Sequence, residues 1–338
     1  MKIILDGMGG DHAPASVVEG AVMALKEMDE EIIIVGQQEL IENELKKYKY
    51  NKKRISIVDA REIITNDDAP VRAVRSKKDS SIVRGINMVK NGEGDIFISA
   101  GSTGALLSGG LFILGRIQGI DRPALASIYP IVGEKPSLLV DAGANAECKP
   151  QNLLEFGIMG NIYMEKVLGR ENPRVGLVNI GEEAKKGNTL SKAAYELLDQ
   201  SNMNFVGNVE ARELPKGACD VIVADGFTGN VVLKLTEGFA WHLLQNIKAR
   251  FTSGLKAKMG AALLIDKISD LKKEFDYSEY GGAPILGVKG PIVKMHGSSG
   301  ASAVKNTILK GIPYVSGNVV ETIQNSVLDI EEIALSEY

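Results

Sequence analysis

Two glycine-rich stretches of this sequence carry residue types that suit the binding of a small anion. Residues 95–107 (DIFISAGSTGALL) and 220–234 (DVIVADGFTGNVVLK) each combine a short aliphatic run, a Gly-x-Thr-Gly turn and the start of a helix. Glycine lets the backbone approach a ligand, and a helix N-terminus presents unpaired N–H groups and partial positive charge. We therefore expect an oxyanion such as phosphate there, with Thr103 and Thr228 capping the helices or touching the anion. Alternatively, both turns only connect a strand to a helix.

Polar side chains in other predicted loops extend this candidate site. They are the amides Asn145, Asn188 and Asn230 and the cations Lys185, Lys186 and Lys294. His296 is most simply a loop histidine. The residues that we predict to bind phosphate or the acyl substrate are Gly101, Ser102, Thr103, Gly104, Asn145, Asn188, Asp225, Gly226, Thr228 and Gly229.

Acidic and sulfur-containing residues give little indication of a metal or cofactor. Asp6, Asp11, Asp141 and Asp225 could hold Mg²⁺, but orienting loop backbones is the commoner role of such residues. The two cysteines, Cys148 and Cys219, lack metal-ligand spacing and fit a reducing compartment. We expect neither metal nor cofactor.

Alternation of strand and helix patterns predicts a three-layer α/β/α fold with a mainly parallel sheet. The expected strands are residues 3–5, 31–35, 55–58, 95–99, 124–129, 137–140, 175–180, 204–206 and 221–224. The expected helices are residues 14–28, 39–47, 70–78, 81–91, 103–116, 150–168, 190–199 and 228–275, with two more closing the chain. Between them come the glycine-rich stretch 280–287 and short extended pieces.

Ligands of parallel sheets bind beyond the carboxyl ends of the strands. That rule places the loops after Leu5, Ser99, Val140, Ile180 and Ala224 around one cleft. The sequence contains no low-complexity linker, so we expect residues 1–338 to form a single catalytic unit with two intimately joined lobes.

Charge and hydropathy exclude some classes of partner. The 338 residues include 39 basic and 43 acidic side chains, and a net charge of −4 argues against nucleic-acid binding. The apolar run at the start is too short for a signal peptide, and no uninterrupted membrane-spanning run follows. We expect a cytoplasmic protein.

Nine motifs together resemble the bacterial phosphate acyltransferases, which are acyl-[acyl carrier protein]:phosphate transacylases. The motifs cover nearly the whole chain: DGMGGDHAP (6–14), SAGSTGA (99–105), GIDRPA (119–124), DAGAN (141–145), KKGN (185–188), GNVEAR (207–212), DGFTGN (225–230), YGGA (280–283) and HGSS (296–299). The resemblance implies a fold similar to phosphotransacetylase and the isocitrate dehydrogenase group, a homodimer, and synthesis of acyl phosphate for phospholipids. Two positions depart slightly, because the family usually has Ala at Gly7 and Asn at Ser102.

The loop residues agree with such a reaction. Inorganic phosphate is already ionised near neutral pH and a thiolate leaves readily, so the protein must mainly position two groups and stabilise an oxyanion. We assign phosphate to the Gly-x-Thr-Gly loops with Lys185 or Lys186, and carbonyl activation to His296 or Asn230.

Three alternatives remain at the level of the sequence. A Cys148 acyl-enzyme would need a partner base, and none occurs at a recognisable spacing. The lack of a Gly-x-Gly-x-x-Gly motif in the first strand–helix unit counts against a nicotinamide-dependent dehydrogenase of the related fold. A non-catalytic acyl-thioester binding protein would not need a phosphate pocket.

Two surface segments suggest macromolecular partners. The densest basic cluster is a candidate docking site for acyl carrier protein and consists of Arg72, Arg75, Lys77 and Lys78. The alternative is a solvated helix face. Residues 251–265 have the pattern of a helix that lies on a membrane surface, with apolar residues Leu255, Met259, Ala262 and Leu263. This stripe could instead pack into the core or against a dimer partner. Acyl phosphate released at the membrane surface would reach a membrane glycerol-phosphate acyltransferase.

Overall fold

The computed structural model describes residues 1–131, 133–254, 264 and 281–336. Within these residues one eleven-stranded sheet runs through both lobes of the molecule, in the order β3-β2-β1-β4-β11-β10-β5-β6-β9-β7-β8. The strands are β1 (Lys2–Asp6), β2 (Glu31–Gly36), β3 (Ile55–Asp59), β4 (Ile96–Ser99), β5 (Ala124–Tyr129), β6 (Ser137–Val140), β7 (Arg174–Asn179), β8 (Asn204–Glu210), β9 (Val221–Val223), β10 (Ala283–Leu286) and β11 (Ile292–Lys294).

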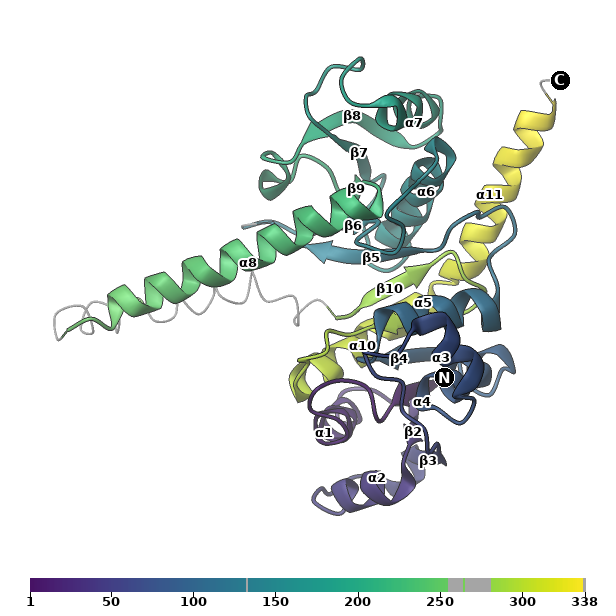
Figure 1. Ribbon diagram of the computed structural model, residues 1–338, viewed down its shortest axis with the longest axis vertical. Helices are drawn as coiled ribbons and strands as arrows, with labels where there is room; N and C mark the ends of the chain where they lie inside the picture. Colours follow the sequence, from purple (N-terminus) through teal and green to yellow (C-terminus); the bar gives the residue numbers. More distant parts are fainter. Residues whose placement is uncertain (132, 255–263, 265–280, 337–338) are drawn as a thin grey trace.

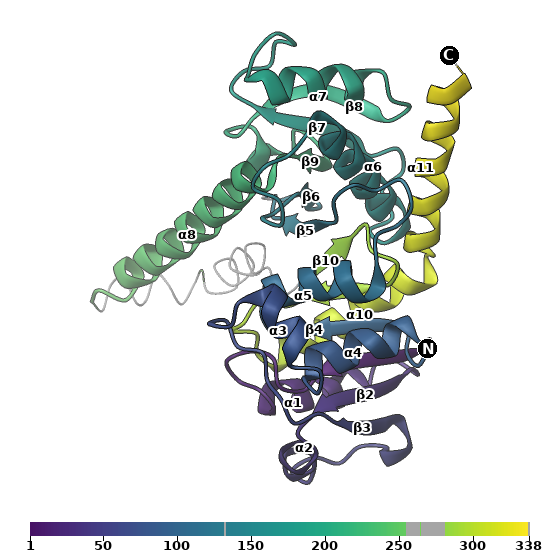
Figure 2. The same ribbon diagram turned by 45° about the vertical axis from the view of Figure 1, so that its right-hand side comes forward.

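Helices cover both faces of this sheet (Figure 1, Figure 2). They are α1 (Ala15–Ala24), α2 (Gln38–Leu45), α3 (Pro70–Ser76), α4 (Ser81–Lys90), α5 (Thr103–Gly109), α6 (Pro150–Lys166), α7 (Thr189–Asp199), α8 (Gly226–Phe251), α10 (Ala301–Ser316) and α11 (Val319–Ser336). Near the end of the chain, α10 packs against α1 of the first lobe and α11 against α6 of the second. The predicted three-layer α/β fold is confirmed.

The strands form where the sequence has short, continuous aliphatic runs. Ile3, Ile4 and Leu5 of β1 are fully buried, and β4, β6 and β9 are buried along their whole lengths. Burial on both faces is what a central strand covered by helices requires. These strands supply the core of each lobe and fix the positions of the loops that follow them.

The centre of the sheet is antiparallel, which was not predicted, although the link between β5 and β6 is too short for a parallel crossover. Strand β10 runs antiparallel to β11 and β5, and β5 runs antiparallel to β6, while the remaining neighbours are parallel. Strand β10 was not predicted, because Pro284 lacks an N–H group and normally argues against an interior strand. The sheet is therefore mainly parallel, as predicted, but its two halves run in opposite directions.

This reversal changes where the loops meet. The carboxyl ends of β1 and β4 lie at one edge of the sheet, whereas those of β6, β7 and β9 lie at the other. The single cleft predicted beyond one edge is therefore wrong. Instead, α8 starts after β9 and passes the central strands before it projects from the body of the molecule (Figure 1). Residues that follow β4, β6 and β9 line one pocket over the central strands, whereas the loops after β1 and β7 contribute none of its lining residues.

Some helix ends also differ from prediction. Ser102 caps α5 and Asp225 caps α8, rather than Thr103 and Thr228. Helix α5 ends at Gly109 and continues as a π-helical turn over Gly110–Leu114. Helix α8 ends at Phe251, so the predicted helix 228–275 does not continue directly beyond that residue. The rest of the predicted range lies largely outside the described residues.

Candidate active site

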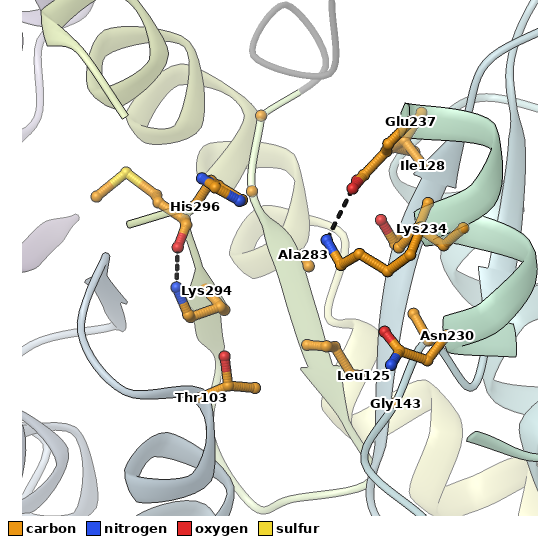
Figure 3. Close-up of a pocket in the computed structure, with 16 residues that line it drawn as sticks. Thr103, Leu125, Ile128, Gly143, Asn230, Lys234, Glu237, Ala283, Lys294 and His296 are labelled. Carbon is orange, nitrogen blue, oxygen red and sulfur yellow. Dashed lines mark hydrogen bonds and ion pairs between the residues drawn. The ribbon is translucent and has the colours of Figure 1, made fainter. Parts of the chain in front are cut away.

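A pocket of about 320 Å³ lies over the central strands, between the two lobes (Figure 3). Its first wall comes from β11 and α5, its second from α8, and its floor from β5 and β10. The lining residues are Thr103, Leu125, Ser127, Ile128, Ala142, Gly143, Asn230, Leu233, Lys234, Glu237, Gly281, Gly282, Ala283, Lys294, Met295 and His296. An apolar pocket with a few convergent polar groups is typical of a small-molecule site.

Lys294 is the most unusual charged residue of the pocket. It ends β11 beside Ser99 of β4, and its Nζ donates to the backbone oxygens of Met295 and, at 3.4 Å, Ala100. Burial lowers the pKa of Lys294 to about 8. The negative charges of Asp6 and Asp11 partly oppose this shift. Lys294 forms no salt bridge with any residue that the structure describes. A largely buried ammonium without a salt bridge is a good receptor for an anion.

Helix α8 presents a second cation from the opposite wall. Asn230, Lys234 and Glu237 recur at helical spacing and therefore share one face of α8 (Figure 3). The Lys234 Nζ lies 2.7 Å from the Glu237 Oε2. Asp225 fixes the start of the helix by accepting from the Thr228 N–H at 2.9 Å and its hydroxyl at 2.7 Å. The helix thus aims these three side chains at the pocket.

His296 follows β11 and lies on the same side of the pocket as Lys294 (Figure 3). Its Nδ1 is 2.8 Å from the Ser298 Oγ. Burial, and then the positive charges of Lys234 and Lys294, lower the pKa of His296. This shift favours the neutral imidazole. Two lysines beside a histidine whose protonation they disfavour indicate a place where an anion binds.

Asp141 organises the loop that brings Gly143 to the pocket. This fully buried carboxylate accepts from the N–H groups of Leu125, Gly143, Ala144 and Asn145 at 2.7–3.1 Å. Burial raises the pKa of Asp141, and these hydrogen bonds oppose that rise. The Asn145 side chain donates to Asp141 and to the Pro123 oxygen at 2.8 Å, so it positions the loop and does not line the pocket.

Asp6 performs a similar task in the first lobe. Its Oδ2 accepts from the Ser99 hydroxyl at 2.6 Å, and the Ser99 Oγ accepts from the Gly101 N–H at 2.9 Å. A side chain at Gly9 would lie only 2.4 Å from Asp6 and 2.6 Å from the Gly101 nitrogen. The loops after β1 and β4 therefore pack directly against each other. Among the described residues, no group of three or more His, Cys, Asp or Glu side chains could hold a metal ion.

The predicted site residues fall into two groups. Thr103, Asn230 and His296 line the pocket, as does Lys294. The others that can be placed support the loops and helix starts. Asn188 caps α7 through the Ser191 N–H.

Three of the predicted glycines allow close packing. A side chain at Gly104 would meet Pro70 at 2.6 Å, and side chains at Gly226 and Gly229 would meet the 141–145 loop at 2.6 and 2.0 Å. These positions need glycine for the fold itself, whether or not the neighbouring backbone also binds substrate.

Lys185 and Lys186 are exposed in the loop after β7 and do not line the pocket. Their assignment to phosphate stays a prediction. Lys234 and Glu237 were not among the predicted residues, although their spacing from Asn230 along one helix face could have indicated them.

Cys148 is poorly suited to act as a nucleophile. It does not line the pocket, and its Sγ lies 3.5 Å from the Asn145 oxygen. Burial, with the negative charges of Asp141 and Asp225, raises the pKa of Cys148 to about 11. Nucleophilic cysteines need the opposite shift.

Comparison with solved structures identifies the fold. A phosphotransacetylase from Streptococcus pyogenes superposes with a TM-score of 0.62 at 19% identity, over 95% of this chain and 94% of that one. The EutD phosphotransacetylase from Staphylococcus aureus gives 0.58 at 16% identity, over 94% of each chain. The chain thus has the phosphotransacetylase fold.

Sequence comparison is more specific. Residues 1–322 match the family model described as "Fatty acid synthesis protein". A phosphate acyltransferase from Alkaliphilus oremlandii is 57% identical over 327 residues, 97% of each chain. The one from Clostridioides difficile is 52% identical over 332 residues, 98% of each chain. The chain belongs to the phosphate acyltransferase family, a family of transferases.

Proposed function

We propose that this protein transfers a long-chain fatty acyl group from acyl-[acyl carrier protein] to inorganic phosphate, giving acyl phosphate for phospholipid synthesis. The observation that carries the proposal is the convergence of Lys294 and Lys234 on one pocket in a phosphate acyltransferase family member. The same pocket has an apolar wall of Leu125, Ile128 and Leu233 beside which a thioester can lie. Cations for phosphate and an apolar wall for the acyl group are the two features that the reaction needs.

The reaction is a direct displacement. A phosphate oxygen, held between Lys294 and Lys234, attacks the thioester carbonyl carbon and forms a tetrahedral oxyanion. The hydroxyl of Thr103 and the side-chain amide of Asn230 are donors that can stabilise that oxyanion. The C–S bond then breaks, and the thiolate leaves and takes a proton from solvent. His296 supplies a further hydrogen-bonding group in the same pocket.

One assay tests the proposal. Acyl-[acyl carrier protein] is mixed with the protein with and without inorganic phosphate, and thiol release and hydroxylamine-sensitive product are measured. We expect both to require phosphate and to rise together. Thioester hydrolysis that proceeds equally without phosphate, or reduction of a nicotinamide, would overturn the proposal.

Docking of acyl carrier protein is proposed at α3, with a narrower set of residues than the sequence suggested. Lys77 is held by Asp68 at 2.7 Å and by the Ile63 oxygen at 2.8 Å. The Lys78 Nζ donates to the Val74 oxygen at 3.2 Å. Arg72 and Arg75 therefore remain as the better candidates within the cluster.

The surroundings of these two arginines support their role. They line a shallow surface groove formed by residues 69–72, 75 and 76, and the Arg75 guanidinium lies 5.2 Å from the centre of the exposed Phe112 ring. Helix α3 packs against α5, which carries Thr103 into the pocket. An acidic carrier bound here would deliver its thioester from close by. Arg72→Glu and Arg75→Glu should raise the KM for the carrier substrate at low salt, whereas Arg212→Glu in the other lobe should not. An unchanged KM in both α3 variants argues against this surface.

Homodimer formation and membrane contact are also proposed. Helix α8 exposes an apolar row of Phe227, Val231, Leu235, Phe239 and Leu243 that a second subunit could cover. Of the predicted membrane segment 251–265, Leu255, Met259, Ala262 and Leu263 lie outside the described residues. The helices that the structure describes include none of sufficient length and hydropathy to span a membrane.

Peripheral binding would let a cytoplasmic enzyme pass acyl phosphate to a membrane glycerol-phosphate acyltransferase. Co-sedimentation with vesicles should increase with anionic lipid and decrease in Leu255→Glu. Wild-type protein that stays in the supernatant at every lipid composition would refute this part of the proposal.

A further inference from the structure

One carboxylate, Glu237, lines the pocket together with its basic side chains in the part of the chain that the structure describes. Its side chain is 29% exposed, and its Oε2 lies 2.7 Å from the Lys234 Nζ. Figure 3 shows Glu237 and Lys234 on the α8 wall, across the pocket from Lys294 and His296. An acid at this position is unexpected, because a site that only attracted anions would gain by omitting it.

The negative charge of Glu237 reaches the interior of the pocket. It opposes the effect of the two lysines by raising the pKa of His296. In this respect Glu237 differs from the other glutamates paired with a lysine three residues away. Glu213 and Lys216 are also 2.7 Å apart, but neither lines the pocket.

A carboxylate next to an anion imposes a chemical requirement on that anion. An ionised carboxylate has acceptor atoms only, so a neighbouring oxyanion must offer an O–H group or be repelled. Hydrogen phosphate carries such a proton at neutral pH. Sulfate has the same tetrahedral shape and similar size but carries none. Arsenate resembles phosphate in having the proton.

We propose that Glu237 is a specificity-determining residue that accepts a hydrogen bond from the protonated oxygen of phosphate and thereby excludes sulfate from the pocket. The inference rests on the proposed function, because it assumes that the anion of this pocket is the acyl acceptor. Lys234 has two tasks in this arrangement. It holds the Glu237 carboxylate in place and contributes positive charge to the anion.

The test compares anion selectivity in wild type, Glu237→Gln, Glu237→Asp and the control Glu213→Gln. The KM for phosphate and the inhibition constants of sulfate and arsenate are measured by acyl phosphate formation, because arsenate can itself accept the acyl group and would sustain thiol release. In Glu237→Gln, the side-chain amide can donate to sulfate. The ratio of the sulfate inhibition constant to the phosphate KM should therefore fall about 10- to 100-fold, the range for a hydrogen bond to a charged group. Glu237→Asp keeps a carboxylate and should still disfavour sulfate, and Glu213→Gln should match wild type.

Arsenate shows whether the proton on the anion, rather than its tetrahedral shape, decides the selectivity. Its inhibition constant should follow the phosphate KM in every variant, so that only sulfate changes its rank. A sulfate-to-phosphate ratio that is unchanged in Glu237→Gln, or that falls equally in Glu213→Gln, would overturn the proposal.

A binding measurement separates this inference from the proposed function. Protection from thermal unfolding by phosphate and by sulfate needs no turnover and is recorded for the same variants. Stabilisation by phosphate but not sulfate, reversed toward sulfate in Glu237→Gln, would support the anion selectivity even if no acyl phosphate formed. In that case only the proposed reaction would fail. Equal stabilisation by both anions in wild type would refute the role of Glu237 while leaving phosphate-dependent acyl transfer intact.

Discussion

Replacement of Lys294 by methionine should make the protein more stable and less active at the same time. The pKa of this ammonium is lowered from 10.5 to about 8 by burial, which corresponds to about 3 kcal/mol of disfavoured charge at pH 7. Methionine fills a similar volume without a charge. Removal of the carbonyl contacts to Ala100 and Met295 opposes the gain, so 3 kcal/mol is an upper limit.

The sign of this effect depends on pH. The unfolded chain binds the lysine proton more tightly than the folded protein does, because the pKa is lower in the folded state. The charge therefore destabilises the folded protein fully below pH 8. Its cost disappears as the pH rises from about 8 to 10.5, where both states lose the proton. The stability advantage of Lys294→Met over wild type should fade across the same interval.

Activity should change in the opposite direction. If Lys294 holds phosphate or the developing oxyanion, its removal should lower kcat/KM for phosphate about 10²-fold or more. The assays are thermal or urea unfolding without phosphate at pH 7 and pH 10, and phosphate-dependent thiol release at pH 7. Phosphate should also stop stabilising the variant against unfolding. A Lys294→Met protein that is less stable than wild type yet equally active would refute the reasoning.

Three further predictions concern the charged and sulfur-containing residues. The kcat/KM for phosphate should fall as pH rises through about 8, where Lys294 loses its charge. A folded Lys294→Arg variant should show this decline at higher pH. An identical pH profile in that variant would show that Lys294 does not cause the decline. Cys148→Ala should retain most activity, because a pKa of about 11 leaves almost no thiolate at pH 7. A large loss of activity would instead support an acyl-enzyme on Cys148. Lys185→Ala and Lys186→Ala should each lose less kcat/KM than Lys294→Met, and a greater loss in either would move the phosphate site toward the loop after β7.

Much of the fold could be predicted because its signals are local. Aliphatic runs such as residues 2–5 and 96–98 are buried whatever the topology, and Gly-x-Thr-Gly turns begin helices in either lobe. The direction of most central strands is not a local property, although the short link between β5 and β6 could have indicated that these two are antiparallel. Pro284 concealed β10, and with it the reversal between the two halves of the sheet.

The site was harder to predict because position in the fold, rather than residue type, distinguishes its members. Lys294 and Lys185 look alike in the sequence, but only Lys294 ends a central strand and lies in the pocket. Ser102 and Thr103 are adjacent hydroxyl residues, and the helix geometry alone decides that one caps α5 while the other lines the pocket. Glu237 lies outside every glycine-rich motif. Its position follows from the helix phase set by Asp225 at the start of α8.

Helix α8 yields a last prediction, which concerns the assembly. Its apolar row has a spacing of four residues from Phe227 to Leu243, and Leu235 and Phe239 are 69% and 68% exposed. Full burial of such side chains is worth about 1.5–3 kcal/mol each, so a second copy of α8 could gain enough to form a dimer. Phe239→Glu should therefore produce a monomer by light scattering at concentrations where wild type is a dimer. Lys248→Glu, two and a half turns further along and on the opposite side of the helix, should remain a dimer.

The pocket-lining Lys234 and Glu237 belong to the same helix, so the monomer should also show a higher KM for phosphate if dimer contacts hold α8 in place. A monomeric wild type, or a Phe239→Glu protein that dimerises normally, would show that this row has another partner.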